Sequence, residues 1–406
     1  MSVVYTRKLK KEIAAQLEND LAIVVTGMRR VGKTFLIQDI LRDIPSPNKI
    51  YIDLEKPENK NIFDVENYDT IIRNFESLGI SIGKEKDKRA WIFLDEIQQI
   101  KQMPSIIKYF HDHYNVKFIV TGSSSYYLKN LFTESLSGRK LIFHLKPLDF
   151  GEFLTFKEID HNLKAESIED LVKLNTKLNA SKYLNLFEEY LKTGGFPQAV
   201  LEKDPIMRAT ILKEILDSYV NIDVKALSDF KGIEDMKKLI YLLPARIGQK
   251  VDVSKISRVV GLSRQTVNSY LRFLEDTFVI STIAPFSKSP DREISQATKM
   301  FFCDHAFANV LNPISEGQLF ENYVFNALSK LYSLNYYQRK SGAEIDFILD
   351  KRIGIEAKVF GDKFDFKKLK SVAEDIGLED EYVISKIPNK PESKEILPAF
   401  LLGFLD

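Results

Sequence analysis

The chain has 406 residues, 44% hydrophobic and 28% charged, which excludes a disordered chain and leaves room for two or three globular domains. The 58 Lys and Arg residues nearly balance the 57 Asp and Glu residues, so the formal net charge of +1 excludes a global field that draws the protein to nucleic acid. The single cysteine, Cys303, excludes an internal disulfide, and the lack of an apolar run of about 18 residues predicts a cytoplasmic protein with no membrane span.

A glycine-bounded loop follows the first predicted strand. Residues 6–20 are predicted to form an amphipathic helix and residues 21–25 a buried strand. The loop Gly27-x-x-x-x-Gly32-Lys33-Thr34 comes next and opens another helix. Glycines let backbone N–H groups turn towards a polyphosphate, and the positive end of the new helix faces the same anion. Lys33 is placed to reach the β- and γ-phosphates of ATP, and the Thr34 hydroxyl to bind Mg²⁺.

Two carboxylates stand at the end of a later strand. A second strand is predicted over residues 49–54, and residues 90–94 form an apolar run typical of a buried parallel strand. Asp95 and Glu96 follow that run, at the edge of the sheet where ligands bind. Asp95 is predicted to hold Mg²⁺ through water or together with Thr34. Glu96 is predicted to take a proton from the water that attacks the γ-phosphate.

Further polar positions border the same predicted sheet. A helix over residues 104–114 leads to a strand over residues 116–125, which ends in a hydroxyl cluster that begins at Ser123. These hydroxyl groups could sense the γ-phosphate, orient the attacking water or cap a helix. Arg139 precedes a strand over residues 141–145 and could serve the phosphates in cis, serve them in trans, or make a salt bridge. Catalysis is assigned to Lys33, Glu96 and Arg139. The predicted nucleotide-binding residues are Gly27, Met28, Arg29, Arg30, Val31, Gly32, Lys33, Thr34, Phe35 and Ser123.

The sequence then becomes helical and contains a helix-turn-helix pattern. The turn Gly194-Gly195-Phe196-Pro197 interrupts the helical stretch from 150 to 244 and is either a helix junction or a hinge. In the later pattern Ser254 is predicted to cap the first helix, Gly261 to end it and Ser263 to cap the second, with a wing strand afterwards. The outward face of the second helix carries residue types that contact DNA, Arg264, Gln265, Asn268, Ser269 and Arg272. The alternative is a winged helix used for packing or for protein contact.

A second candidate site lies near the C-terminus. A helix over residues 318–328 carries one acid, Glu321, and three strands separated by turns follow it. Because side chains alternate along strands, Asp346, Glu356 and Lys358 can converge at a bend of this small sheet. Three carboxylates and a lysine can bind Mg²⁺ and position a hydroxide on a phosphodiester. The alternative is a set of exposed charges on a sheet edge.

Taken together, these motifs resemble those of prokaryotic P-loop ATPases of the AAA or STAND type that carry a C-terminal DUF4143 module. The resemblance is carried by Gly27 to Thr34, Leu94-Asp95-Glu96, Thr121-Gly122-Ser123-Ser124, Ser137-Gly138-Arg139, Pro147-Leu148 and Gly194-Gly195-Phe196-Pro197. The C-terminal part resembles the PD-(D/E)xK nuclease fold, with Glu321, Asp346 and Glu356-x-Lys358 matching its pattern and Ile345 where the pattern has proline. The resemblance implies ATP and Mg²⁺ binding and a winged helix between the two ends.

The predicted fold is α/β with four parts. They are a parallel-sheet P-loop ATPase core over residues 1–149, a helical lid over 150–245, a winged helix-turn-helix over 246–290, and a restriction-endonuclease-like domain over 291–406. Three functions stay open: a nucleotide-driven switch acting with nucleic acid, an ATP-gated metal-dependent DNA nuclease, and a non-catalytic DNA-binding or scaffold protein. The sequence leaves open whether the protein is a monomer or a homo-oligomer.

Overall fold

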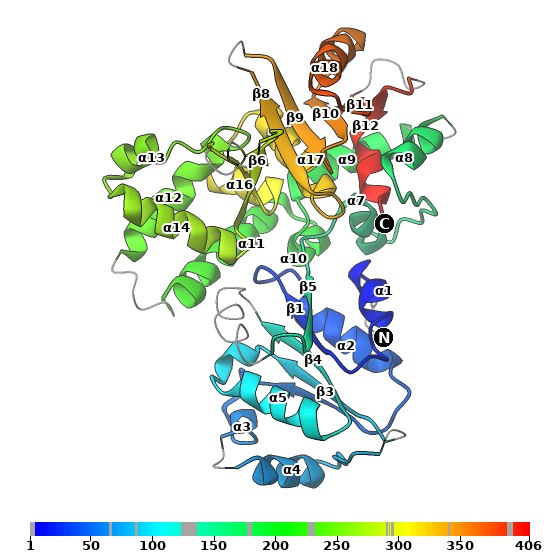
Figure 1. Ribbon diagram of the computed structural model, residues 1–406, viewed down its shortest axis with the longest axis vertical. Helices are drawn as coiled ribbons and strands as arrows, with labels where there is room; N and C mark the ends of the chain where they lie inside the picture. Colours follow the sequence, from blue (N-terminus) through cyan, green and yellow to red (C-terminus); the bar gives the residue numbers. More distant parts are fainter. Residues whose placement is uncertain are drawn as a thin grey trace. The chain divides into compact units, whose positions relative to one another are not determined.

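The computed structural model describes residues 5–64, 67–85, 88–122, 136–176, 181–225, 232–289, 291, 293, 296–339, 342–387 and 393–406. The chain divides into two compact units (Figure 1). The first unit comprises Met1–Lys146 and Asp276–Phe278, and the second comprises Pro147–Glu275 and Val279–Asp406. The expected lid, helix-turn-helix and C-terminal domain therefore share the second unit, apart from residues 276–278.

A five-stranded parallel sheet forms the centre of the first unit, with the order β2-β3-β4-β1-β5. Each strand predicted from the sequence in this unit is present. The strands are β1 (Ala22–Thr26), β2 (Lys49–Asp53), β3 (Ala90–Asp95), β4 (Val116–Gly122) and β5 (Lys140–His144). Because β3 and β1 lie on either side of β4, the ends of these three strands come together at one edge of the sheet.

Helices cover both faces of this sheet. They are α1 (Leu9–Ala14), α2 (Lys33–Asp43), α3 (Pro57–Lys60), α4 (Tyr68–Ser77), the short 3-10 helix η1 (Ile97–Gln99) and α5 (Met103–His113). The helix predicted over residues 6–20 is shorter than expected. The buried Lys117 ammonium donates hydrogen bonds to the carbonyl oxygens of Gln16, Asn19 and Leu21, at 2.8, 2.8 and 2.7 Å. These bonds hold the chain after α1 in a non-helical path.

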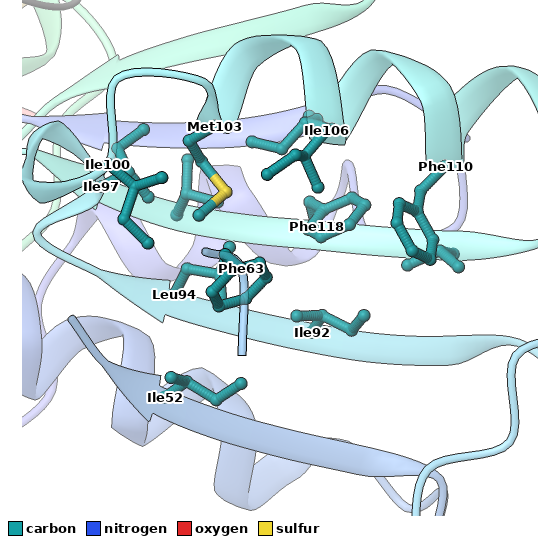
Figure 2. Packing of buried hydrophobic residues seen from close by; sticks show 14 of the residues in the cluster. Ile52, Phe63, Ile92, Leu94, Ile97, Ile100, Met103, Ile106, Phe110 and Phe118 are labelled. Carbon is teal, nitrogen blue, oxygen red and sulfur yellow. The ribbon is translucent and has the colours of Figure 1, made fainter. Parts of the chain in front are cut away.

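An apolar core fills the space between the sheet and α4 and α5. Figure 2 shows Met103, Ile106 and Phe110 of α5 facing Ile92 and Phe118 of the sheet. All five side chains are buried. Burial of side chains of this size stabilises the unit by roughly 1.5–3 kcal/mol each, so this packing fixes the position of β3 and of the carboxylates at its end.

A seven-stranded mixed sheet forms the second unit, with the order β12-β11-β10-β9-β8-β6-β7. The strands are β6 (Ile280–Pro285), β7 (Lys299–Phe302), β8 (Leu334–Gln338), β9 (Glu344–Leu349), β10 (Ile353–Lys358), β11 (Asp380–Ser385) and β12 (Ile396–Pro398). The expected strand-turn-strand-turn-strand segment is the antiparallel run β8-β9-β10. The strand expected as a wing is β6, which pairs with β7 and also with β8, so it is continuous with the large sheet.

Helices from distant parts of the chain pack in the second unit. They are α7 (Phe150–Phe156), α8 (Ile168–Asn175), α9 (Ser181–Thr193), α10 (Pro197–Leu201), α11 (Pro205–Ser218), the π-helix η2 (Tyr219–Val224), α12 (Ile233–Leu242), η3 (Leu243–Arg246), α13 (Val253–Val260), α14 (Arg264–Asp276), α16 (His305–Leu311), α17 (Glu316–Leu328), α18 (Lys363–Ile376) and η4 (Ala399–Phe404). The Phe150 ring packs against Phe400 and Phe404, with centroids 6.5 and 6.1 Å apart. The stretch expected as a lid is thus joined to the C-terminal residues by a shared core. No helix in the described part of the chain has the length and apolar character that crossing a membrane requires.

The turn at Gly194–Pro197 is a tightly packed junction. The Gly195 N–H donates to the buried carboxylate of Asp304 at 2.7 Å, and the same carboxylate accepts from the N–H of Phe307 at 2.8 Å. Gly194 has φ +74°, and a Cβ there would lie 2.4 Å from the Asp304 carboxylate. Of the two readings of this turn, the helix junction is the one that these contacts fit.

Candidate functional site

The glycine-bounded loop between β1 and α2 has the backbone geometry that its sequence predicts. Gly27 has φ +146°, and a Cβ there would lie 2.2 Å from the Leu145 carbonyl oxygen, so only glycine fits. Gly32 precedes α2 with φ +98°. The buried Arg7 donates to the Val31 carbonyl at 2.8 Å and thereby supports the loop from its outer side.

Lys33 lies in the first turn of α2 with its ammonium directed back over the loop. Its Nζ donates to the carbonyl oxygens of Gly27 and Met28, at 3.0 and 3.1 Å. Met28 and Val31 are buried, so these two predicted nucleotide-binding residues can offer only backbone groups to a ligand. Phe35, in contrast, leaves 78% of its surface exposed beside the loop.

Asp95 is buried at the end of β3, where three hydroxyl groups surround its carboxylate. Thr34 Oγ1 and Tyr51 OH donate to Oδ2 at 2.7 and 2.8 Å, and Thr121 Oγ1 donates to Oδ1. Burial and then the Asp95 charge raise the pKa of Tyr51, so the phenol keeps the proton that it donates. A carboxylate bonded to a threonine hydroxyl at the start of a phosphate-loop helix is an oxygen set that fits Mg²⁺.

Glu96 follows Asp95 in a left-handed conformation, with φ 57° and ψ 53°. Its N–H donates to Thr121 Oγ1 at 3.0 Å, and its carboxylate accepts a hydrogen bond from the Gln98 side chain. Burial and then the Glu96 charge raise the pKa of Glu55, which places these two carboxylates near each other at the same edge of the sheet. The turn therefore directs Glu96 away from the core while Asp95 stays within it.

Arg139 does not lie with these residues. It precedes β5, and its carbonyl oxygen accepts from the N–H of Ala22, which is the first residue of β1, whereas the phosphate loop follows the last. Its guanidinium donates to the Asp112 carboxylate at 2.8 and 3.2 Å and holds the pKa of Asp112 at about 2. A role for Arg139 on the phosphates in cis is thus wrong, because the two groups lie at opposite edges of the sheet. Ser123 lies outside the described residues.

Glu321, Asp346, Glu356 and Lys358 are brought into one neighbourhood in the second unit, together with Lys299 of β7. The Lys358 ammonium lies 2.6 Å from Glu356 Oε1. Asp346 Oδ2 accepts from the Ala357 N–H at 2.9 Å. The predicted strand alternation is therefore correct, and the carboxylates come from the helix and strands that the sequence indicates.

These carboxylates share a buried environment. Burial and then the neighbouring Asp346 charge raise the pKa of Glu321 to about 8 and that of Glu356 to about 7. Burial also raises the pKa of Asp346. Nevertheless, in the described part of the chain no three His, Cys, Asp or Glu side chains are grouped so that they could hold a metal ion. The predicted convergence of Glu321, Asp346 and Glu356 on one ion is not found.

The two helices of the helix-turn-helix pattern are α13 and α14. Asp252, not Ser254, caps α13 by accepting from the Lys255 N–H at 2.9 Å, because the helix begins two residues earlier than expected. Gly261 ends α13 with φ +74°, and Ser263 caps α14 by accepting from the Thr266 N–H at 3.1 Å, both as predicted. The expected contact residues Arg264, Gln265, Asn268, Ser269 and Arg272 are all exposed.

Three residues that support these sites were missed in the sequence. Arg7 and Tyr51 belong to no recognisable motif. The role of Arg7 depends on its contact with the loop, and that of Tyr51 depends on β2 lying beside β3. Lys299 could have been noticed as a charged residue directly before the apolar run Met300-Phe301-Phe302, since a lysine at the start of a buried strand is rarely found unless it is paired.

Comparison with known proteins finds matches to domain models along the chain. A family model described as an AAA domain matches residues 19–154. Models of two domains of unknown function, DUF8612 and DUF4143, match residues 184–318 and 316–402. The chain thus contains an AAA-type P-loop ATPase domain and a DUF4143 domain, as the sequence resemblance implied.

Relatives of nearly full length are also found. An uncharacterized protein of Methanocaldococcus jannaschii is 28% identical over 351 residues, which is 84% of this chain and 75% of that protein. One of Haemophilus influenzae is 28% identical over 354 residues, 82% of this chain and 80% of that protein. Among solved structures, a Walker-type ATPase of Pyrococcus abyssi matches 76% of this chain and 96% of its own, with 16% identity and a TM-score of 0.47. The Aeropyrum pernix ORC1 protein in complex with DNA matches 77% of this chain and 93% of its own, with 13% identity and a TM-score of 0.32.

Proposed function

We propose that this chain binds ATP with Mg²⁺ at the phosphate loop, hydrolyses it, and works as a nucleotide-driven switch that acts with nucleic acid. The hydrogen bond between Thr34 and the buried Asp95 carries the proposal. It joins the start of α2 to the end of β3, and those are the two places from which a P-loop site takes its Mg²⁺ ligands.

Each residue has a role that its position supports. The loop N–H groups and the N-terminus of α2 bind the phosphates, and Lys33 exchanges its two carbonyl partners for phosphate oxygens. Thr34 and Asp95 would hold Mg²⁺, which would supply positive charge for the phosphates during transfer. Glu96 lies outside the core and accepts the proton of the attacking water.

The test compares ATP binding and ATP turnover in three variants. Lys33→Ala should lose both, because no other side chain replaces its charge on the phosphates. Glu96→Gln should retain binding while turnover falls by roughly 10²–10⁴-fold, the range for loss of a general base. Lys49→Ala is the matched control, since the Lys49 ammonium also donates to two carbonyl oxygens, of Leu41 and Ile44, but Lys49 lies at the start of β2, whereas the phosphate loop follows the end of β1. Turnover that survives Lys33→Ala would end the proposal.

The nucleic-acid half of the proposal rests on α14. Its exposed face carries Arg264 and Arg272, with Gln265 and Asn268 between them, and these side chains suit phosphates and base edges. Such a helix-turn-helix is also compatible with a non-catalytic DNA-binding or scaffold protein that keeps its nucleotide. Arg264→Ala with Arg272→Ala should lower DNA affinity and reduce its dependence on salt. If the double variant keeps the DNA affinity of the wild type, α14 does not contact DNA.

A metal-dependent nuclease is the competing function for the second unit. Asp346 and Glu356 on neighbouring strands, with Lys358 beside Glu356, support it. The residues present do not form a metal site in this arrangement, so no cleavage step is assigned to them. Incubation of DNA with Mg²⁺ or Mn²⁺, with and without ATP, compares the wild type with Asp346→Ala. Cleavage lost in that variant would establish the nuclease.

A further inference from the structure

Lys299 is a buried lysine inside the C-terminal carboxylate cluster. It is the first residue of β7 and leaves only 3% of its surface exposed. Its Nζ contacts Glu344 Oε1 and lies 3.6 Å from Glu321 Oε1. The same ammonium lies 5.3 Å from the centre of the Tyr336 ring. A lysine is buried in this way only where opposite charges compensate it.

We propose that the Lys299 ammonium is the resident cation of this cluster and excludes a divalent metal ion from it. The acids that a nuclease would use for metal are instead shared between two lysines of the chain. Lys299 faces Glu321 and Glu344, and Lys358 faces Glu356. A metal ion in the same cluster would stand close to the Lys299 charge and would be repelled by it.

Two buried carboxylate oxygen atoms of the cluster make no hydrogen bond. Within the described residues, Glu321 Oε1 and Glu356 Oε2 are buried and have no hydrogen-bond partner. Among the described residues, this neighbourhood contains four carboxyl groups and two ammonium groups. The carboxyl groups are those of Glu321, Glu344, Asp346 and Glu356, and the ammonium groups are those of Lys299 and Lys358. Removal of Lys299 would therefore leave a strongly acidic, oxygen-lined space, which is what a hard divalent cation binds.

A backbone segment also covers the cluster. Gly248 has φ +71°, and a Cβ there would lie 2.2 Å from the Glu321 carboxylate. The Gly248 N–H donates to the Met300 carbonyl at 3.1 Å, and Gln318 donates to the carbonyl of Ala245 at 3.3 Å. The segment is thus fastened to both β7 and α17.

The experiment measures Mn²⁺ binding to the full chain without nucleotide, by calorimetry and by electron paramagnetic resonance. Lys299→Met should bind Mn²⁺ at least about tenfold more tightly than the wild type, because a like charge is removed from the site. Lys299→Arg keeps the charge and should show no gain. Addition of Asp346→Asn to Lys299→Met should abolish the gain, which separates this site from the phosphate loop.

Lys250→Met is the matched control, since the Lys250 ammonium lies 5.7 Å from the same Tyr336 ring but is exposed. It should leave Mn²⁺ binding unchanged. Equal Mn²⁺ affinity in the wild type and in Lys299→Met would overturn the proposal. If Lys299→Met does not fold, the comparison of the wild type with Asp346→Asn decides. A Mn²⁺ site in the wild type that Asp346→Asn removes would contradict a resident ammonium, and the absence of such a site would support a resident ammonium. The readout is metal binding, so its result is independent of whether ATP is hydrolysed or DNA is cut.

Discussion

Tyr51→Phe tests whether the hydroxyl groups around Asp95 hold it for Mg²⁺. The substitution removes one oxygen atom from a half-buried ring and one hydrogen bond, the 2.8 Å bond from Tyr51 to Asp95 Oδ2. Thr34 and Thr121 continue to donate to the carboxylate. The change therefore loosens Asp95 without removing any ligand of the metal or of the nucleotide.

The size of the effect follows from the charge on the acceptor. A hydrogen bond to a charged group contributes about 1.5–3 kcal/mol, and the lower end applies because two donors remain on Asp95. A loss of about 1.5 kcal/mol corresponds to roughly tenfold weaker binding. In other proteins, loss of a hydrogen-bond partner of a metal ligand weakens metal binding by roughly 10–100-fold, which agrees with this value.

The assay titrates Mg²⁺ at saturating ATP and records the rate of hydrolysis. Tyr51→Phe should need about tenfold more Mg²⁺ for half-maximal rate, while metal-free nucleotide binding stays unchanged. Burial and the Asp95 charge raise the pKa of Tyr51 above its ordinary value of 10, so the phenol donates throughout the neutral range and the effect should not vary with pH there. Tyr68→Phe is the control, because the Tyr68 ring stacks on Tyr109 in α5 rather than on the site. A wild-type Mg²⁺ dependence in Tyr51→Phe would refute the role given to this hydroxyl.

Three further predictions concern stability and placement. Gly194→Ala should destabilise the second unit by about 2–4 kcal/mol in chemical denaturation, because the left-handed backbone is strained by a side chain and the new Cβ would lie 2.4 Å from the Asp304 carboxylate. Gly261→Ala is the control: it has the same φ of +74° but open space around the new Cβ, so it should cost only about 1–2 kcal/mol. Burial raises the pKa of Glu321 from 4.5 to about 8, so the folded state holds a proton that the unfolded chain releases. Stability should then fall as the pH rises between about 5 and 8, and thermal melts should show a smaller fall in Glu321→Gln. Arg139→Ala should retain wild-type ATP affinity in a binding titration, since Arg139 lies at the far edge of the sheet; weakened binding would place it at the phosphates after all.

Much of the first unit could be predicted because its signals are local. A strand, a glycine-bounded loop and a helix that begins at Lys33 follow one another in the chain, and the motif places glycine at Gly27. The steric reason, the approach of the Leu145 carbonyl oxygen, appears only in the structure. The end of β3 was equally clear, since an apolar run stops at Asp95. The partners of Asp95 were not predictable in full, because Tyr51 approaches it only through the pairing of β2 with β3.

The second unit was harder to predict because its contacts join distant segments. Period-two alternation correctly placed Asp346 and Glu356 near each other, but it cannot show what else enters the same space. Lys299 is 47 residues before Asp346 in the printed sequence, and it reaches the cluster from β7, at the end of the sheet. The helical stretch after residue 150 was recognised as helical, yet its packing on Phe400 and Phe404 depends on rings near the C-terminus.

The division into units bears on how a nucleotide-driven change could reach the rest of the chain. Residues Asp276–Phe278 belong to the first unit, although they lie at the end of α14 and lead to β6. The Phe278 ring packs on His144 of β5, with centroids 5.1 Å apart, and the next residue, Leu145, touches Gly27 of the phosphate loop through its carbonyl oxygen. A change in the loop that displaces Leu145 would therefore act on the residues that directly follow α14.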